Sequence, residues 1–381
     1  MRILITFVGG FGHLAPLLPV ARAARALGHD VAIAGSGGLV GRIEEAGFRG
    51  YPTSPRPHHS GTAVTRDLTP LQPTDARAAE VEFAANFASR GARRMAGAVP
   101  AVLEDFRPDL VIRDETDLGT TIAAELHDVP VATHLVLASG LLVRPELVGP
   151  ELDSVRSEHG LAPDPGLARL TSGPVLSAFP PGLRSPEAPV ALSPVHYRRV
   201  DGPPRSAVRA RARRPRVYAT LGTIFNKTSG DLLERMAAGL AGLDADALLT
   251  VGRDIDPRDL GAQPDHVRIE GFVPQEDVLS GTDVVVHHGG SGVLLDALRH
   301  GLPSVVLPLG ADQSHNARRA GELGLARTLD AATVTPRELA HQVEESLADT
   351  DLRGRCEQVA AQVEGLPDVD AVVAELLATS G

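Results

Sequence analysis

The sequence predicts an α/β protein of two domains, each a parallel sheet with helices on both faces, that face each other across a cleft. Three observations support this. The 381 residues exceed one ordinary domain and suit two of roughly 180 residues each. Short runs rich in Val, Ile and Leu alternate with helical stretches in both halves. A proline-rich stretch from residue 179 to 216 separates the halves.

The N-terminal domain is predicted to span residues 1–200. Its strands are short, apolar and separated by helices, at residues 3–8, 30–34, 110–112 and 129–132. Apolar positions at helical spacing predict a helix at residues 17–27, after a glycine turn, and another at 118–127. Residues 51–78 lack such periodicity and predict a long loop on the cleft side, and long loops in compact domains are often functional.

A linker at residues 201–216 leads into a C-terminal domain at residues 217–365. Its predicted strands lie at residues 217–220, 248–251, 267–269, 284–286 and 305–307. Three amphipathic helices follow, at residues 336–348, 352–363 and 369–378. We expect the last one, within residues 366–381, to pack back on the N-terminal domain.

Composition excludes several classes of protein. A net charge of −11 argues against a nucleic-acid partner, and no apolar run approaches the roughly 18 residues that span a bilayer. The single cysteine, Cys356, makes a cysteine-based metal site very unfavourable. The first apolar run is short and reads as a buried strand, which predicts a cytoplasmic protein. A homodimer stays open.

A glycine-rich turn in the C-terminal half predicts a phosphate site. The strand at residues 284–286 runs into His287-His288-Gly289-Gly290-Ser291-Gly292. Helix N-termini beyond the carboxyl ends of parallel strands bind anions, and glycines let the backbone approach a diphosphate. We expect Ser291 to cap the helix and His288 to donate one further hydrogen bond. The alternative is a tight strand-to-helix turn without a ligand.

A second glycine turn, near the N-terminus, carries a histidine. Gly10-Phe11-Gly12-His13-Leu14-Ala15 matches the dinucleotide pattern G-x-G-x-x-A, but the acidic residue expected about 20 positions on is missing. His13 at a helix N-terminus favours the neutral imidazole that a general base requires. Asp114, after a predicted strand, could orient the ring. The alternative is a turn histidine satisfied by the backbone.

No metal site or cofactor is predicted. Asp-x-Asp pairs, which hold a metal in one class of sugar transferase, occur at residues 244/246, 254/256, 349/351 and 368/370. Several such pairs are expected by chance in an acidic chain, and none follows an apolar strand with other ligands. The helix N-terminus and His288 would then neutralise a leaving diphosphate.

The stretch from Gly271 to Asn316 resembles the family 1 glycosyltransferases, the inverting, metal-independent enzymes of the GT-B fold with two Rossmann-like domains. The residues that carry the resemblance are Phe272-Val273-Pro274-Gln275, the turn at 287–292 and Asp312-Gln313. The chain is most similar to the bacterial members that glycosylate natural products. It departs from them at Val293, where relatives often have Ser or Thr, and at Asp296, where many have a ribose-binding Glu.

The resemblance implies roles for particular residues. It implies that Phe272 faces the base, that Val273 reads it through the backbone, that Gln275 lies near the ribose and that His13 deprotonates the acceptor. The implied nucleotide-sugar contacts are Gly12, Thr223, Phe272, Val273, Gln275, His288, Gly290, Ser291, Gly292, Asp296, Asp312 and Gln313.

The implied reaction moves a deoxysugar from a nucleotide diphosphate, thymidine diphosphate by resemblance, to a hydroxyl of a hydrophobic natural product. Only 3% of residues are aromatic, so we expect a mostly aliphatic acceptor pocket. Its candidate residues are Phe83, Phe87, Met95 and His134, together with the loop at 51–78. The spacing of Phe83 and Phe87 equally fits ordinary helix core.

Two other functions stay open at this point. The N-terminal glycines suggest an NAD(P)-dependent oxidoreductase, which the missing acidic residue opposes. A non-catalytic auxiliary protein could keep the fold and bind only the acceptor, which the presence of both His13 and the phosphate turn opposes.

Overall fold

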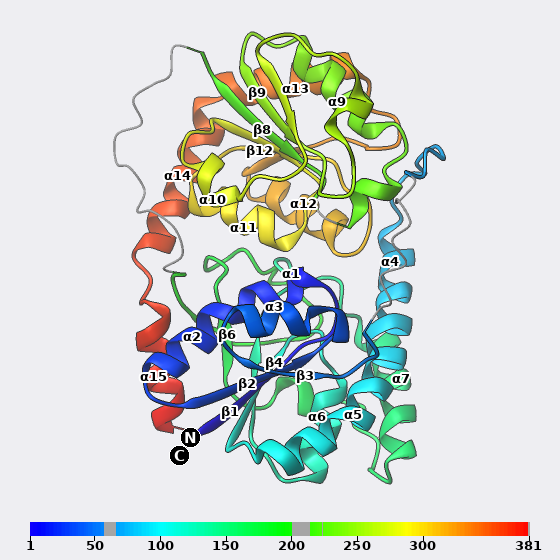
Figure 1. The fold of residues 1–381 in the computed structure, drawn as a ribbon, viewed down its shortest axis with the longest axis vertical. Coiled ribbons are helices and arrows are strands. Elements are labelled where there is room, and N and C mark those ends of the chain that lie inside the picture. Colours follow the sequence, from blue (N-terminus) through cyan, green and yellow to red (C-terminus); the bar gives the residue numbers. More distant parts are fainter. Residues whose placement is uncertain (57–65, 200–213, 223, 380–381) are drawn as a thin grey trace. The chain divides into compact units, whose positions relative to one another are not determined.

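Two parallel sheets organise the computed structural model, which describes residues 1–56, 66–199, 214–222 and 224–379 (Figure 1). Each sheet lies in its own unit. Unit 1 comprises residues 1–59, 77–201 and 365–381, and unit 2 comprises residues 60–76 and 202–364. Most of the predicted linker at 201–216 lies outside the described residues.

The unit 1 sheet has, among the described residues, seven strands in the order β3-β2-β1-β4-β5-β6-β7, all parallel. The strands are β1 (Arg2–Thr6), β2 (Asp30–Gly35), β3 (Arg49–Pro52), β4 (Leu110–Asp114), β5 (Val131–His134), β6 (Val175–Ser177) and β7 (Val195–His196). Ile5 pairs with Ile33 on β2 and with Ile112 on β4. The strand order reverses between β1 and β4, and ligands of open parallel sheets bind at such a switch point.

Helices cover both faces of this sheet. They are α1 (Phe11–Leu14), α2 (Leu18–Ala26), α3 (Val40–Glu45), α4 (Ala76–Phe83), α5 (Ala92–Phe106), α6 (Gly119–Leu126), α7 (Pro145–Glu158), α8 (Ala168–Thr171) and α15 (Val369–Thr379). Short 3₁₀ turns occupy Ala15–Leu17 and Gly37–Leu39. The last helix, α15, packs against α2, and both chain ends lie nearby in Figure 1.

Unit 2 repeats the architecture with strand order β10-β9-β8-β11-β12-β13, again parallel throughout. The strands are β8 (Arg216–Thr220), β9 (Asp246–Thr250), β10 (Val267–Glu270), β11 (Val284–His287), β12 (Ser304–Val306) and β13 (Ala326–Thr328). The helices are α9 (Leu232–Ala241), α10 (Gln275–Leu279), α11 (Ser291–Arg299), α12 (Gln313–Glu322), α13 (Pro336–Ala348) and α14 (Thr350–Glu364), with 3₁₀ turns at Phe225–Thr228 and Pro257–Leu260.

The cores follow from the apolar strands. Buried apolar residues of β8, β9 and β11 join α9 and α13 in one cluster of buried side chains, and the strand residues in it are Val217, Ala219, Ala247, Leu249, Val284 and Val286. A capping box between Thr335 and Glu338 fixes the start of α13.

The two doubly wound sheets confirm the predicted fold class. Several features were not predicted, among them the strands β3 and β13. The strand β6 lies just before the proline-rich stretch at residues 179–216 and β7 lies within it, and they have only three and two residues, so no apolar run indicates them. Ala84–Gly91, between α4 and α5, forms a π-helical segment, a geometry that sequence periodicity does not distinguish from an ordinary helix.

Candidate functional site

In unit 1, β1 and a short glycine turn place His13 at the carboxyl edge of the sheet. His13 lies in α1, and its side chain is 23% exposed. Gly9 lies under the imidazole with φ of 119°, and a Cβ there would approach the ring to 2.5 Å. A glycine is therefore required at this position both by the left-handed backbone and by the close approach of the ring.

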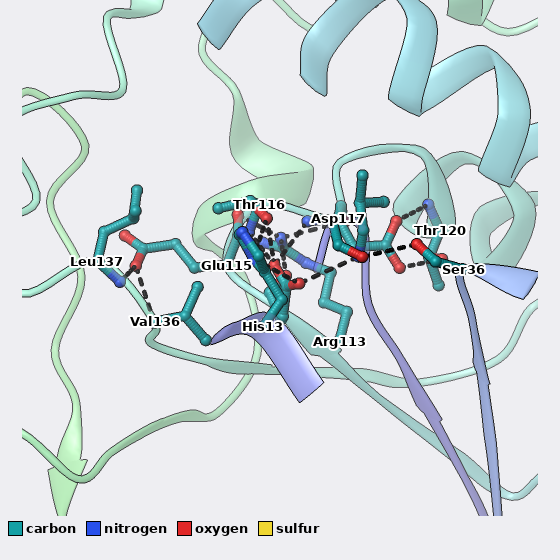
Figure 2. A network of polar contacts seen from close by, with 12 residues as sticks. His13, Ser36, Arg113, Glu115, Thr116, Asp117, Thr120, Val136 and Leu137 are labelled. Carbon is teal, nitrogen blue, oxygen red and sulfur yellow. Dashed lines mark hydrogen bonds and ion pairs between the residues drawn. The ribbon is translucent and has the colours of Figure 1, made fainter. Parts of the chain in front are cut away.

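Asp114 ends the neighbouring strand β4 and is completely buried. One carboxylate oxygen, Oδ2, accepts from the Val8 N–H at 3.1 Å and lies 3.3 Å from His13 Nδ1. The other, Oδ1, accepts from the Thr116 hydroxyl at 2.6 Å and from the N–H groups of Thr116 and Asp117. Figure 2 shows His13 and Thr116 together in this network. The carboxylate is thus fixed on all sides.

The same contacts determine the tautomer of His13. Thr116 Oγ1 lies 3.1 Å from His13 Nδ1 and has only one proton, which it gives to Asp114. His13 Nδ1 must then carry the proton that both oxygens accept, so in the neutral ring Nε2 keeps its lone pair. Burial raises the pKa of Asp114, but His13 and the Thr116 hydrogen bonds outweigh it and hold that pKa below its usual value. Asp114 therefore stays ionised beside the imidazole.

The carboxylate next to this pair behaves differently. Burial, with Asp114 close by, raises the pKa of Asp117 to about 6, although the Thr120 hydroxyl donates to it at 2.6 Å. Arg113, also fully buried, donates to the carbonyl oxygens of Asp114, Glu115 and Asp117 (Figure 2). Arg113 therefore holds together the loop that carries Asp114 and Thr116.

The residues predicted to line an acceptor pocket occupy different environments. Phe87, in the π-helical segment, is half-buried, with its ring centroid 5.7 Å from that of His13 and stacked on Phe83. Phe83 and Met95 lie in the core, and His134 is completely buried with Nε2 2.7 Å from the Tyr197 hydroxyl. These three side chains offer a ligand almost no surface in this structure, because they fill the core.

In unit 2, the turn after β11 is organised by two neutral histidines. His287 is completely buried and accepts from the Gly289 N–H at 3.0 Å, and burial lowers its pKa to about 3. His288 follows, half-buried, with its pKa lowered by desolvation to about 4. Its ring lies between Gly222 and Gly290, where a Cβ would come within 2.8 and 2.6 Å of it. Side chains at either glycine would displace the imidazole.

The predicted helix cap was wrong. Gly290 is the N-cap of α11, and Ser291, the first helical residue, donates its hydroxyl to Asp312 Oδ2 at 2.6 Å. Asn316 donates to the same carboxylate at 2.7 Å and to the Gly289 carbonyl at 3.0 Å. The Ser291 hydroxyl therefore bonds to the Asp312 carboxylate and does not cap the backbone of α11. This network joins the starts of α11 and α12. The amides of the first turn of α11 have no acceptor within the helix, as at any helix N-terminus.

The other predicted donor residues are dispersed around the same sheet edge. Phe272 is 45% exposed, with the Arg253 guanidinium 3.8 Å from its ring centroid. Gln275 begins α10, and Val273 beside it is half-buried. Gln313 is buried and accepts from the Leu309 N–H at 2.8 Å.

Four predicted donor residues remain. Gly292 and Asp296 lie inside α11, with Asp296 3.5 Å from Arg299, and Gly12 lies in α1 of unit 1. Thr223 lies outside the described residues.

In the part of the chain that the structure describes, no group of three His, Cys, Asp or Glu side chains could hold a metal ion. No helix among these residues is long and apolar enough to cross a membrane.

Comparison with known proteins identifies the family. A model of the erythromycin biosynthesis protein CIII-like C-terminal domain matches residues 234–379. The chain is 31% identical to the elloramycin glycosyltransferase of Streptomyces olivaceus, over 88% of each chain. The chain belongs to the family 1 glycosyltransferases of natural-product biosynthesis. The glycosyltransferase SnogD of Streptomyces nogalater superposes with a TM-score of 0.75 at 26% identity, covering 100% of this chain and 99% of the other.

A second structure carries a ligand. The Streptomyces sp. SF2575 glycosyltransferase SsfS6, complexed with thymidine diphosphate, matches with a TM-score of 0.74 and 25% identity over 99% of each chain. This family 1 enzyme is thus a glycosyltransferase with the GT-B fold. The oxidoreductase and the non-catalytic alternatives are no longer needed.

Two site residues of this glycosyltransferase were not predicted from the sequence. Thr116 lies two positions after Asp114, and nothing in its spacing shows that its hydroxyl reaches His13. Asn316 is completely buried four residues after Asp312. The only signal for Asn316 in the sequence was its spacing, because residues four apart on a helix lie on the same face and Asp312 was a predicted binding residue.

Proposed function

We propose that this glycosyltransferase moves a deoxysugar from a thymidine-diphosphate donor to a hydroxyl group of a hydrophobic natural product, with inversion at the anomeric carbon and without a metal ion. The observation that carries the proposal is the His13–Asp114–Thr116 arrangement, which holds the proton of a half-buried neutral imidazole on Nδ1 and so leaves Nε2 as the basic nitrogen. Such a nitrogen at the carboxyl edge of a sheet is suited to general-base catalysis.

In the proposed step, His13 Nε2 takes the proton from the acceptor hydroxyl as the oxygen attacks the anomeric carbon. The bond between that carbon and the diphosphate oxygen breaks, and the electron pair leaves with the nucleotide diphosphate. Attack from the face opposite the leaving group inverts the configuration. Asp114 stays ionised and stabilises the imidazolium that forms, as the orienting carboxylate of a catalytic dyad does.

The turn before α11 is the proposed place of the diphosphate. Helix N-termini carry partial positive charge, and the extended backbone at Gly290 brings the first-turn amides to the carboxyl edge of the sheet. Neutral His288 beside Gly290 adds a donor without the desolvation of a full charge. These fixed dipoles support departure of the diphosphate without a metal.

The nucleotide and the acceptor are proposed from relatives and composition. The SsfS6 structure is a complex with thymidine diphosphate, and the elloramycin enzyme is named for its antibiotic. Phe272 offers an exposed ring face for a base, already covered on one side by Arg253. The low aromatic content supports an aliphatic acceptor pocket around Phe87.

The test is a transfer reaction with a thymidine-diphosphate deoxysugar and a polyketide aglycone in excess EDTA, with the product examined by proton NMR. We expect a product whose anomeric coupling shows the configuration opposite to that of the donor, at a rate that EDTA leaves unchanged. A product with the donor's configuration, or transfer abolished by EDTA and restored by a divalent cation, would contradict the mechanism.

A further inference from the structure

A phenylalanine in unit 2 lies beside the proposed place of the diphosphate and has no part in the mechanism above. Phe225 begins the 3₁₀ turn Phe225–Thr228 after β8 and is half-buried. Its ring centroid lies 6.4 Å from that of His288, which follows β11. A Cβ at Gly310, in the loop after β12, would approach Phe225 Cε1 to 3.0 Å. The ring thus reaches the segments that follow two other strands of its sheet.

The strand order determines what this ring covers. β11 lies between β8 and β12 in the sheet, and neighbouring strands are about 4.8 Å apart. A side chain from the segment after β8 that reaches both His288 and Gly310 therefore crosses the carboxyl end of β11. The turn after β11 is the proposed place of the diphosphate. Because one oxygen joins the anomeric carbon to that diphosphate, the sugar ring of a bound donor begins within reach of Phe225.

The turn that carries Phe225 is held in place within unit 2. Asn226 is buried, and its side-chain amide donates to the Val251 carbonyl at 2.7 Å. The Lys227 carbonyl accepts from the Asp67 N–H at 2.9 Å, so the segment at residues 66–76 also fixes this turn. The ring therefore presents the same surface before and after a donor binds.

An aromatic ring selects sugars by the C–H groups that they turn toward it. A pyranose face made of C–H groups packs on such a ring, whereas a hydroxyl pressed against it loses its hydrogen bonds to water and gains none. A deoxysugar has a CH₂ or CH₃ group where an ordinary hexose has a hydroxyl, so it offers Phe225 more apolar surface. Apolar contacts reject an added hydroxyl by up to about 10²-fold.

The polar side chains nearby also favour a sugar with few hydroxyls. Gln313 Oε1 accepts from the N–H groups of Leu309 and Gly310, at 2.8 and 3.3 Å. Asp312 Oδ2 accepts from the Ser291 hydroxyl at 2.6 Å. These two oxygens belong to the residues predicted to bind hydroxyls of the donor sugar, and both are engaged within the protein. A sugar with fewer hydroxyls leaves fewer of its own groups without a partner.

We propose that Phe225 is a specificity-determining residue for the donor, and that its ring packs on the C–H face of a deoxysugar and disfavours a sugar with a hydroxyl there. The inference rests on the proposed function for the nucleotide and for the place of the diphosphate. Phe225 touches the sugar and takes no proton, so its replacement changes which donor is preferred.

The test compares thymidine-diphosphate glucose with its 2-deoxy and 6-deoxy analogues by calorimetric titration of the full-length protein. We expect the better of the two deoxy analogues to bind the wild type about tenfold more tightly than the glucose donor. In Phe225→Asn, whose amide bonds to a hydroxyl, this ratio should fall to about one. Because the ratio compares two donors on the same protein, a general loss of affinity in the variant cancels.

Two variants serve as controls for this ratio. Phe225→Leu keeps an apolar side chain and should keep most of the preference. Leu126→Asn makes a similar change at the last residue of α6 in unit 1, which is 42% exposed, and should give the wild-type ratio.

A second measurement uses the wild type and so does not depend on how the asparagine variant folds. In deuterated protein with protonated phenylalanine, nuclear Overhauser effects should connect phenylalanine ring protons with the CH₂ or CH₃ protons of the preferred deoxy analogue. Phe225→Leu should lose these effects although it still binds the nucleotide.

Three outcomes overturn the role of Phe225: equal affinity of the wild type for all three donors, a preference that Phe225→Asn retains, or no Overhauser effect between phenylalanine and the bound sugar. Binding needs no acceptor, so the two proposals fail separately. Inverting transfer without any preference among the three sugars overturns only the role of Phe225. A preference that depends on Phe225, in an enzyme whose product retains the donor's configuration, contradicts only the proposed function.

Discussion

The imidazole of His13 depends on Thr116 as much as on Asp114. Thr116 Oγ1 is the nearer of the two oxygens, at 3.1 Å against 3.3 Å, and its proton is committed to Asp114. The sequence pointed to a histidine on a glycine turn and an aspartate after a strand. The sequence did not indicate Thr116, because a hydroxyl that is positioned by a loop leaves no periodic pattern in the sequence.

Changing either partner should disturb the tautomer. Asp114→Asn presents an amide that can donate to Nδ1, so the proton moves to Nε2 and the base is lost, and we expect kcat to fall on the order of 10²-fold or more. Thr116→Val removes one acceptor and should reduce kcat less. Thr116→Ser keeps the hydroxyl and serves as the control in the same steady-state assay. Wild-type kcat in Asp114→Asn would disprove the orienting role.

The glycines around His288 give a second prediction for single residues. Gly290→Ala places a methyl group 2.6 Å from His288 Nε2 and must push the ring away, so we expect affinity for thymidine diphosphate to fall about tenfold or more. Gly354→Ala lies inside α14, where a Cβ meets nothing within 4 Å, and should leave affinity unchanged. Calorimetric titration of both variants measures this, and equal affinity would argue against the proposed place of the diphosphate.

Among the elements, the segment from residue 66 to 76 departs most from the sequence-based expectation. It comes from the loop predicted at 51–78, yet it packs on unit 2. Arg66 donates to both carboxylate oxygens of Glu234, at 2.6 and 2.9 Å, and to the Gly230 carbonyl, while Leu71 packs against the unit 2 core. Glu234, the partner of Arg66, lies 168 residues away in the sequence. Leu71 is a single leucine between prolines and gives no periodic signal, so the sequence did not predict this packing.

Arg66 should hold this segment in place. Arg66→Met removes the two-pronged contact, and since Glu234 is 41% exposed we expect a loss of only about 1 kcal/mol in the free energy of unfolding of unit 2. Faster proteolytic cleavage of the segment should accompany it. Arg258→Met breaks an exposed pair with Asp256 and is the control. Unaltered cleavage of the segment in Arg66→Met would show that the contact does not anchor it.

For the whole molecule, the sequence predicted both sheets because apolar strands buried on two faces give a clear sequence pattern.

Side chains buried in each unit also determine how its stability responds to pH. His134 and His287 are fully buried, and desolvation lowers their pKa values to about 4 and about 3. Both lie below the unfolded value near 6.5, so their contribution to stability is complete above pH 6.5 and is lost as the pH falls.

Relative to pH 7, each histidine should lower the free energy of unfolding at pH 5 by about 2 kcal/mol. Asp117, with its pKa raised to about 6, acts in the opposite direction and offsets only about 1 kcal/mol at that pH. We therefore expect urea midpoints to fall between pH 7 and 5. The double variant His134→Gln/His287→Asn keeps hydrogen-bonding atoms at both places and should flatten that slope. An unchanged slope would exclude these histidines as its cause.

The account as a whole depends on His13 acting as the base for transfer. The most direct measurement compares wild type and His13→Ala for two quantities, turnover of a thymidine-diphosphate deoxysugar with an aglycone and the affinity for thymidine diphosphate. We predict that turnover falls on the order of 10²-fold or more, because Nε2 no longer removes the acceptor proton, while affinity stays that of the wild type. Undiminished turnover in His13→Ala would contradict the mechanism.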